Sequence, residues 1–249
     1  MFDVKLLSRA LKARWRDQAH ELGAVKKAMA DGGIAIDVGA NKGSYLYSMA
    51  RWSKAAPVYA FEPQRVLADY LRTACKISGL TNVHIENLAL SDKAGELDLY
   101  VPGDSTSPGA SLEPGIADKT DCHKETVKVT SLDTYADERI QAPVRVIKID
   151  VEGHELAVIK GALRLIQRDK PLLIIECEDR HLPAGQTVAS FIRLVESLGY
   201  SATLAMRGKA ELPAREFATN LHQKQAGERF WDAKDYYNNF IFRPTELAL

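Results

Sequence analysis

Short apolar runs alternate along most of the chain with segments whose apolar residues have helical spacing. The apolar runs, which are rich in β-branched and aromatic residues, predict strands at 34–38, 58–61, 83–90, 144–150, 172–176, 201–205 and 238–242. The intervening segments predict helices at 44–52, 65–79, 155–167 and 187–198. Strands that alternate with helices indicate an α/β fold, with a mostly parallel sheet covered by helices on both faces.

The alternation is interrupted between about residues 95 and 130. Half-exposed patterns at 96–101 and 125–129 predict the two strands of a hairpin, and the loop 102–115 between them is rich in Pro, Gly and Ser. This segment is too regular for a linker, so we expect one domain over 32–249 with an inserted hairpin. The loop is a candidate lid on the acceptor side of the site, and an ordinary surface loop is the alternative.

The first 31 residues have a separate pattern. Leucines, a tryptophan and a valine recur near helical spacing among many basic residues, which predicts an amphipathic helix packed on the domain. A mitochondrial targeting helix is the alternative, and the acidic residues in the segment argue against it. No apolar run is long enough for a membrane span.

Composition narrows the possible partners. The chain has 249 residues, of which 33 are Lys or Arg and 33 are Asp or Glu, so its formal net charge is zero. This balance gives no electrostatic reason to expect nucleic acid or an anionic membrane as the main partner. The three cysteines include no CxxC pair, which predicts a reducing, cytoplasmic location without a disulfide framework or zinc site.

The first chemical motif, Asp-Val-Gly-Ala-Asn-Lys-Gly, occupies residues 37–43, where the first strand turns into a helix. Glycines at such a turn let the backbone approach a ligand, and the helix N-terminus offers unpaired N–H groups. The acidic Asp37 precedes the first glycine and would repel a pyrophosphate, whereas a ligand with an ammonium group would be attracted. S-adenosylmethionine has such a group, and the absence of GxGxxG disfavours an NAD(P) dehydrogenase.

Polar residues also follow the second and third strands. Glu62, before Pro63, lies 23 residues after Gly39, a spacing that suits a carboxylate binding both ribose hydroxyls of a nucleoside. Asn87 and Ala89 follow at the next strand end. Asn87 is a candidate hydrogen-bonding partner of adenine, and a structural turn is the alternative.

Candidate catalytic groups follow the fourth and fifth strands. Asp150 and Glu176 each end an apolar strand, and His154 opens the helix after Asp150, so we expect all three near one cleft. Carboxylates and a histidine can deprotonate a hydroxyl, directly or through a divalent metal such as Mg²⁺. For the neighbouring Glu155, a favourable charge at a helix N-terminus is the preferred interpretation. The Asn/Asp-Pro-Pro-aromatic motif used to methylate nucleobase amines is absent.

Together, these motifs resemble the FkbM family of methyltransferases over roughly residues 34–180. The matching segments are 36–43, 61–63, 87–91, 109–112, 129–133 and, most specifically, Lys-Ile-Asp-Val-Glu-Gly-His-Glu at 148–155. The resemblance implies a Rossmann-like class I methyltransferase with a seven-stranded sheet and S-adenosylmethionine as cofactor. Family members mostly O-methylate hydroxyls of sugars, glycolipids or polyketide-type compounds.

The resemblance also implies roles for individual residues. Residues near the cofactor would be Asp37, Gly39, Ala40, Asn41, Gly43, Ser44, Glu62, Pro63, Asn87, Ala89 and Asp150. Asp150, Glu152 and Glu176 would face a small-molecule or saccharide acceptor, with Asp150, His154 or Glu176 as the catalytic base. The alternatives are a nucleoside-binding module without catalysis and an RNA methyltransferase that uses the basic N-terminal helix. A homodimer is an open possibility.

Overall fold

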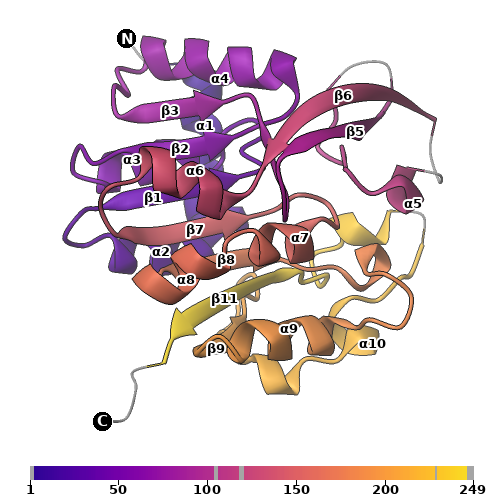
Figure 1. Cartoon of the computed structure of the whole chain (residues 1–249). Helices are drawn as coiled ribbons and strands as arrows, with labels where there is room; N and C mark the ends of the chain where they lie inside the picture. The colour runs from indigo at the N-terminus through magenta and orange to yellow at the C-terminus, as the bar shows by residue number, and fades with distance from the viewer. Residues whose placement is uncertain (1–2, 104–105, 118–120, 228, 246–249) are drawn as a thin grey trace.

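The computed structural model describes residues 3–103, 106–117, 121–227 and 229–245. Its centre is an eight-stranded sheet (Figure 1) with the strand order β10-β9-β11-β8-β7-β1-β2-β3. The strands are β1 (Ile34–Val38), β2 (Val58–Phe61), β3 (Val83–Glu86), β7 (Val144–Ile149), β8 (Leu172–Glu176), β9 (Tyr200–Leu204), β10 (Leu212–Pro213) and β11 (Asn239–Pro244).

Most of the sheet is parallel. β3, β2, β1, β7 and β8 pair in parallel, whereas β11 pairs antiparallel with both β8 and β9. The prediction of a mostly parallel sheet of seven strands is confirmed, and the two-residue β10 adds an eighth strand at one edge. β1 is an interior strand of the sheet: it pairs with β2 on one side and with β7 on the other, and all five of its residues are buried.

Helices cover both faces of the sheet, because successive side chains of each strand point to opposite sides. On β1, Ile34, Ile36 and Val38 join the core beneath one helical layer, and Ala35 joins the core beneath the other. The first layer contains α6 (Leu132–Arg139), α7 (Glu155–Lys160), α8 (Leu163–Asp169) and α9 (Val188–Glu196). The second contains α3 (Leu46–Trp52), α4 (Arg65–Ile77) and the N-terminal helices.

The N-terminal segment forms three helical pieces where the sequence pattern predicts one helix. These are α1 (Val4–Lys12), the π-helix η1 (Ala13–Asp17) and α2 (Ala19–Ala28). The helical backbone is interrupted at Gln18, which has φ −133° and ψ 40°. Leu6 of α1 and Leu22 of α2 are fully buried in the core of the second layer, so the predicted amphipathic character is present on both sides of the break.

The predicted hairpin between β3 and β7 is confirmed as β5 (Gly95–Pro102) paired antiparallel with β6 (Cys122–Thr130). A third strand, β4 (Ala89–Leu90), pairs in parallel with β6 and completes a small separate sheet. The single strand predicted at 83–90 is therefore divided into β3 and β4. Asn87 lies at the division, where its side chain donates to the backbone carbonyls of Glu62 and Pro63.

The helix predicted at 155–167 is also divided, into α7 and α8. The chain turns at Gly161, whose backbone approaches the residue after β4 so closely that a Cβ there would lie 2.0 Å from the carbonyl oxygen of Ser91. The remaining short elements are α5 (Pro114–Ala117), η2 (Asp179–His181), η3 (Ala214–Glu216), α10 (Thr219–His222) and η4 (Phe230–Asp232). Within the described ranges, no helix combines the length and apolarity that crossing a membrane requires.

The packing of α1 predicts a large difference between two substitutions in that helix. Leu6→Ala removes a fully buried side chain, so the free energy of unfolding should fall by about 2–5 kcal/mol. Val4→Ala, at a position that is 77% exposed, should change it by less than about 0.5 kcal/mol. Urea unfolding of both variants measures the difference, and equal effects would show that α1 is not packed as described.

Candidate active site

A cavity of about 340 Å³ lies at the carboxyl ends of β1, β2, β7 and β8. This is the edge of an open α/β sheet at which ligands bind, next to the point where the strand order reverses between β1 and β7. The loop between β5 and β6 and the N-terminal segment also contribute to its wall. The lining residues used below are Gln18, Asp37, Gly39, Tyr45, Glu62, Gln64, Leu88, Leu99, Pro108, Leu112, Lys148, Asp150, Glu152 and Glu176.

A buried lysine joins the two central strands at this edge. Lys148 on β7 is the register partner of Asp37 on β1, and its side chain is only 5% exposed. The ammonium donates to the carbonyl oxygen of Gly39 at 2.9 Å and lies 3.5 Å from Asp37 and 3.2 Å from Asp150. Burial alone would lower the pKa of Lys148, but the two carboxylates raise it above its ordinary value. The lysine is therefore charged.

The glycine after β1 permits a close approach of two main chains. Gly39 has φ +73°, and a Cβ built on it would lie 1.8 Å from the carbonyl oxygen of Asp150. Two residues later, Asn41 also has a positive φ, of 47°, a conformation that asparagine tolerates better than most residues. The sequence Gly-Ala-Asn therefore folds as a tight turn against the end of β7, and the backbone N–H groups of its three residues donate to Phe61 and Glu62 at the end of β2.

Glu62 is held rigidly on the cavity wall. One of its carboxylate oxygens accepts from the backbone N–H of Asn41 at 2.7 Å, and the other accepts from the N–H of Gln64 at 2.9 Å. Burial raises the pKa of Glu62 to about 7, although these two hydrogen bonds act to lower it. Each oxygen keeps a further lone pair, so the carboxylate can accept hydrogen bonds from two ribose hydroxyls.

Three carboxyl groups gather at the carboxyl ends of β7 and β8. Asp150, Glu152 and Glu176 each place an oxygen within 4.8 Å of the others, a spacing that can hold a divalent cation. Burial raises the pKa of Glu176 above its ordinary value, and the charge of Asp150 and a hydrogen bond with it raise it further. Burial would also raise the pKa of Asp150, but the ammonium of Lys148 and the Glu176 hydrogen bond hold it below its ordinary value.

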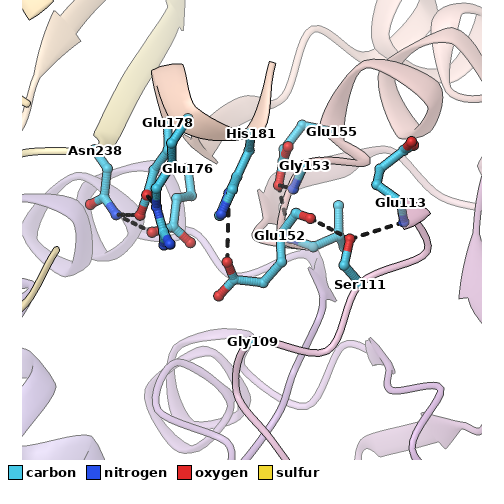
Figure 2. A network of polar contacts seen from close by, with 12 residues as sticks. Gly109, Ser111, Glu113, Glu152, Gly153, Glu155, Glu176, Glu178, His181 and Asn238 are labelled. Atoms are coloured by element: carbon cyan, nitrogen blue, oxygen red, sulfur yellow. Dashed lines mark hydrogen bonds and ion pairs between the residues drawn. The ribbon is translucent and has the colours of Figure 1, made fainter. Parts of the chain in front are cut away.

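The surroundings fix two of these carboxyl groups (Figure 2). Asn238, just before β11, donates from its side-chain amide to both Glu176 and Glu178. Glu152, which has a positive φ of 53°, lies with an oxygen 3.6 Å from Nδ1 of His181. Residues next to β11 and in η2 therefore hold the carboxyl groups of Glu176 and Glu152 in place.

The loop after β5 closes one side of the cavity. Gln64 forms two hydrogen bonds of 2.9 Å with the backbone of Ser107, one in each direction. At the other end, the hydroxyl of Ser111 donates to the carbonyl oxygen of Glu152 at 2.5 Å (Figure 2). The candidate lid loop therefore contributes to the cavity wall, which its apolar residues Pro108, Ala110 and Leu112 line, and its role as a lid on the acceptor side stays a prediction. Residues 104–105 of that loop lie outside the described residues.

Most of the predicted site residues are brought together on the cavity wall. They are Asp37, Gly39, Ala40, Asn41, Ser44, Glu62, Pro63, Ala89, Asp150 and Glu176. Gly43 and Asn87 do not line it. A Cβ on Gly43 would lie 2.7 Å from Leu6, so this glycine admits α1 to the core, and the amide of Asn87 braces the backbone of Glu62.

His154 also lies away from the cavity wall, contrary to the expectation that it faces the cleft. Its Nε2 is 2.9 Å from the Ser91 hydroxyl, and its Nδ1 is 2.6 Å from Glu113. Both ring nitrogens are thus engaged in joining β4, the loop and the start of α7. Glu155 accepts from the backbone N–H groups of Val151 and Gly153, which agrees with a structural role at the helix N-terminus.

Sequence reasoning missed several lining residues. Lys148 carried a visible signal, since it is a charged residue among the apolar residues that end β7, but its partners Asp37 and Gly39 come from elsewhere in the chain. Gln64 follows Pro63 without any recognisable motif. Gln18 and Tyr45 belong to helical segments whose ends reach the cavity only in the folded molecule.

Comparison with known proteins places this arrangement in a family. The model of the methyltransferase FkbM domain matches residues 37–202, more than half of the chain. The chain belongs to the FkbM methyltransferase family. The family resemblance read from the sequence is thereby confirmed. The matched FkbM segment runs from the end of β1 to β9 and contains the carboxyl cluster, whereas α1, η1 and α2 lie outside it.

Individual relatives agree with this assignment. The FkbM-family chain is 31% identical over 160 residues to methyltransferase sdnD of Sordaria araneosa, covering 51% of this chain and 59% of that protein. It resembles a solved methyltransferase FkbM from Methylobacillus flagellatus KT with a TM-score of 0.51 and 19% identity, covering 85% of this chain and 44% of that one. The chain thus spans about half the length of these relatives.

A further solved structure supports the Rossmann-like class I fold. Cofactor-bound Rv0187 from MTB matches with a TM-score of 0.50 and 13% identity, covering 98% of this chain and 90% of that one. At this identity the likeness concerns the fold alone.

The close contact at Gly39 predicts a difference between two glycine substitutions. Gly39 and Gly79 have similar positive φ values, +73° and +65°, so alanine should cost about 1–2 kcal/mol of backbone strain at either position. Only Gly39→Ala also meets the backbone of Asp150, so its unfolding free energy should fall by about a further 1–3 kcal/mol. Equal losses in urea unfolding would mean that β1 and β7 do not approach as described.

Proposed function

We propose that this FkbM-family chain is an S-adenosylmethionine-dependent O-methyltransferase. Its acceptor is the hydroxyl of a sugar, a glycolipid or oligosaccharide, or a polyketide-type small molecule. The family assignment supports methyl transfer, and the charge of the cavity supports the cofactor. Within the described residues, the lining contains a single ammonium, that of Lys148, and five carboxyl groups: Asp37, Glu62, Asp150, Glu152 and Glu176.

That distribution of charge is the observation that carries the proposal. An acidic wall attracts a cationic ligand and disfavours a pyrophosphate, because the one ammonium is already engaged with Gly39, Asp37 and Asp150. Glu62 is placed to accept the ribose hydroxyls. The apolar wall formed by Leu88, Leu99 and the loop suits the adenine ring.

When bound, S-adenosylmethionine supplies an electrophilic methyl group on a positively charged sulfur. The chain's own contribution is to position the acceptor oxygen and to remove its proton. We assign the proton acceptor to Glu176, whose pKa is raised by burial and by Asp150. In this scheme Glu62 would hold the ribose of the cofactor, Glu176 would take the hydroxyl proton, and the acceptor oxygen would gain the methyl group that the cofactor supplies, with S-adenosylhomocysteine as the other product.

The proposal includes a cytoplasmic location. Cys75 and Cys177 are buried and free, which suits the reducing cytoplasm. His154 has no place in the proposed chemistry, because Ser91 and Glu113 engage both of its ring nitrogens.

Ligand binding and methyl transfer test the proposed function directly. In calorimetry the chain should bind S-adenosylhomocysteine and not NADH, since Glu62 lies in an acidic cavity whose one ammonium among the described residues, that of Lys148, is already engaged. Labelled methyl from S-adenosylmethionine should then enter a hydroxylated glycan or polyketide-type compound, with a mass gain of one CH₂ unit. NADH binding without S-adenosylhomocysteine binding would overturn the proposal. Salt-sensitive labelling of RNA alone would favour the RNA methyltransferase instead.

The assignment of the base predicts a pH dependence. A proton acceptor must be ionised, so turnover should fall as the pH falls through the pKa of Glu176, at a higher pH than for an exposed glutamate. Glu176→Gln should lower kcat by at least about a hundredfold and remove this limb of the pH profile, while S-adenosylhomocysteine affinity is kept.

The control is Glu125→Gln, which neutralises an exposed carboxylate on β6 and should leave both kcat and the pH profile unchanged. Wild-type turnover in Glu176→Gln would remove Glu176 from the mechanism.

A further inference from the structure

The N-terminal segment reaches the cavity at a point that the family match does not include. Gln18, at the break between η1 and α2, lines the cavity, whereas the FkbM match begins at residue 37. Tyr45, which precedes α3, lines the same cavity and is 3% exposed. A π-helical turn within an α-helical segment is uncommon and is found frequently at functional sites.

Unpaired polar atoms are concentrated at this place. In the described part of the chain, buried side-chain polar atoms without a hydrogen-bond partner are Gln18 Oε1, Asp37 Oδ1, Tyr45 OH and Tyr200 OH. All but Tyr200 belong to residues that line the cavity. A buried polar atom without a partner is costly, so three such atoms on residues that line one cavity indicate a ligand that supplies the missing donors.

The charge around these atoms identifies the kind of donor. Asp37 is 1% exposed, and the ammonium of Lys148 forms an ion pair with its Oδ1 at 3.5 Å while donating its hydrogen bond of 2.9 Å to Gly39, so Oδ1 can still accept from a further donor. Burial raises the pKa of the Tyr45 hydroxyl, and the carboxyl groups of Glu21, Asp150, Asp37 and Glu176 raise it further. The surroundings of Tyr45 are therefore acidic, which favours a cationic group.

A primary ammonium group meets both requirements. It carries one positive charge and three N–H donors, which match the amide oxygen of Gln18, the carboxylate of Asp37 and the hydroxyl oxygen of Tyr45. The terminal amide of glutamine rotates with a broad preference, so its oxygen can turn into the cavity when the ligand binds.

We propose that Gln18 and Tyr45, together with Asp37, form a subsite for the ammonium group of an α-amino acid moiety. This inference rests on the proposed function, in which that moiety is the methionyl half of the cofactor. The N-terminal helices then complete the cofactor site of this chain. They also make it selective for the intact cofactor over its nucleoside fragment.

The test compares two ligands that differ by the amino acid moiety. S-adenosylhomocysteine carries the ammonium, and 5′-methylthioadenosine has the same nucleoside and sulfur without it. In calorimetry, Gln18→Leu should weaken S-adenosylhomocysteine binding at least about tenfold and leave 5′-methylthioadenosine binding unchanged. Tyr45→Phe, which removes only the hydroxyl, should weaken binding in the same selective way.

Lys12→Gln is the control, because Lys12 lies on the outer side of the same segment with a side chain that is 57% exposed, and it should bind both ligands like the wild type. Unchanged S-adenosylhomocysteine affinity in both Gln18→Leu and Tyr45→Phe, or equal losses for the two ligands, would overturn the subsite. A wild-type chain that binds neither ligand would instead overturn the proposed function.

Discussion

The buried ammonium of Lys148 is the interaction on which the rest of the site depends. It joins the ends of the two central strands by donating to the turn at Gly39 while lying between Asp37 and Asp150. Without it, the buried carboxyl group of Asp37 would have no compensating charge, and breaking a buried pair such as Lys148–Asp37 costs about 3–5 kcal/mol. The same ammonium keeps Asp150 ionised, and Asp150 in turn raises the pKa of Glu176. One lysine therefore links the packing of β1 against β7 to the chemistry at the sheet edge.

Two segments outside the sheet, the loop after β5 and the N-terminal helices, complete the wall of the cavity at this edge. The loop after β5 forms hydrogen bonds with Gln64, which follows β2, and with Glu152, which follows β7. It therefore connects the ends of two strands on either side of β1. The N-terminal helices pack in the same layer as α3 and α4, and Gln18 at their break forms part of the cavity wall. The parallel strands thus supply the charged groups of the cavity, while the loop and the N-terminal segment complete its wall.

The sequence patterns predicted the central strands and the polar residues at their ends because these features are local. Asp37, Glu62, Asp150 and Glu176 each follow an apolar run, and topology alone brings such positions to one edge. Features that depend on distant partners were not predictable. The helix over 155–167 divides because Gly161 packs on the backbone of Ser91, and the N-terminal helix divides at Gln18. In the same way, the position of His154 follows from Ser91 and Glu113, which no nearby pattern could indicate.

A crystal structure of the chain with S-adenosylhomocysteine tests the central claim most directly, namely that the acidic strand edge organised by Lys148 is the cofactor site. The account predicts ribose hydroxyls within hydrogen-bond distance of Glu62, adenine beneath the loop at Pro108 and Leu112, and sulfur facing Asp150 and Glu176. A ligand bound away from this edge, or one whose ribose makes no contact with Glu62, would contradict it.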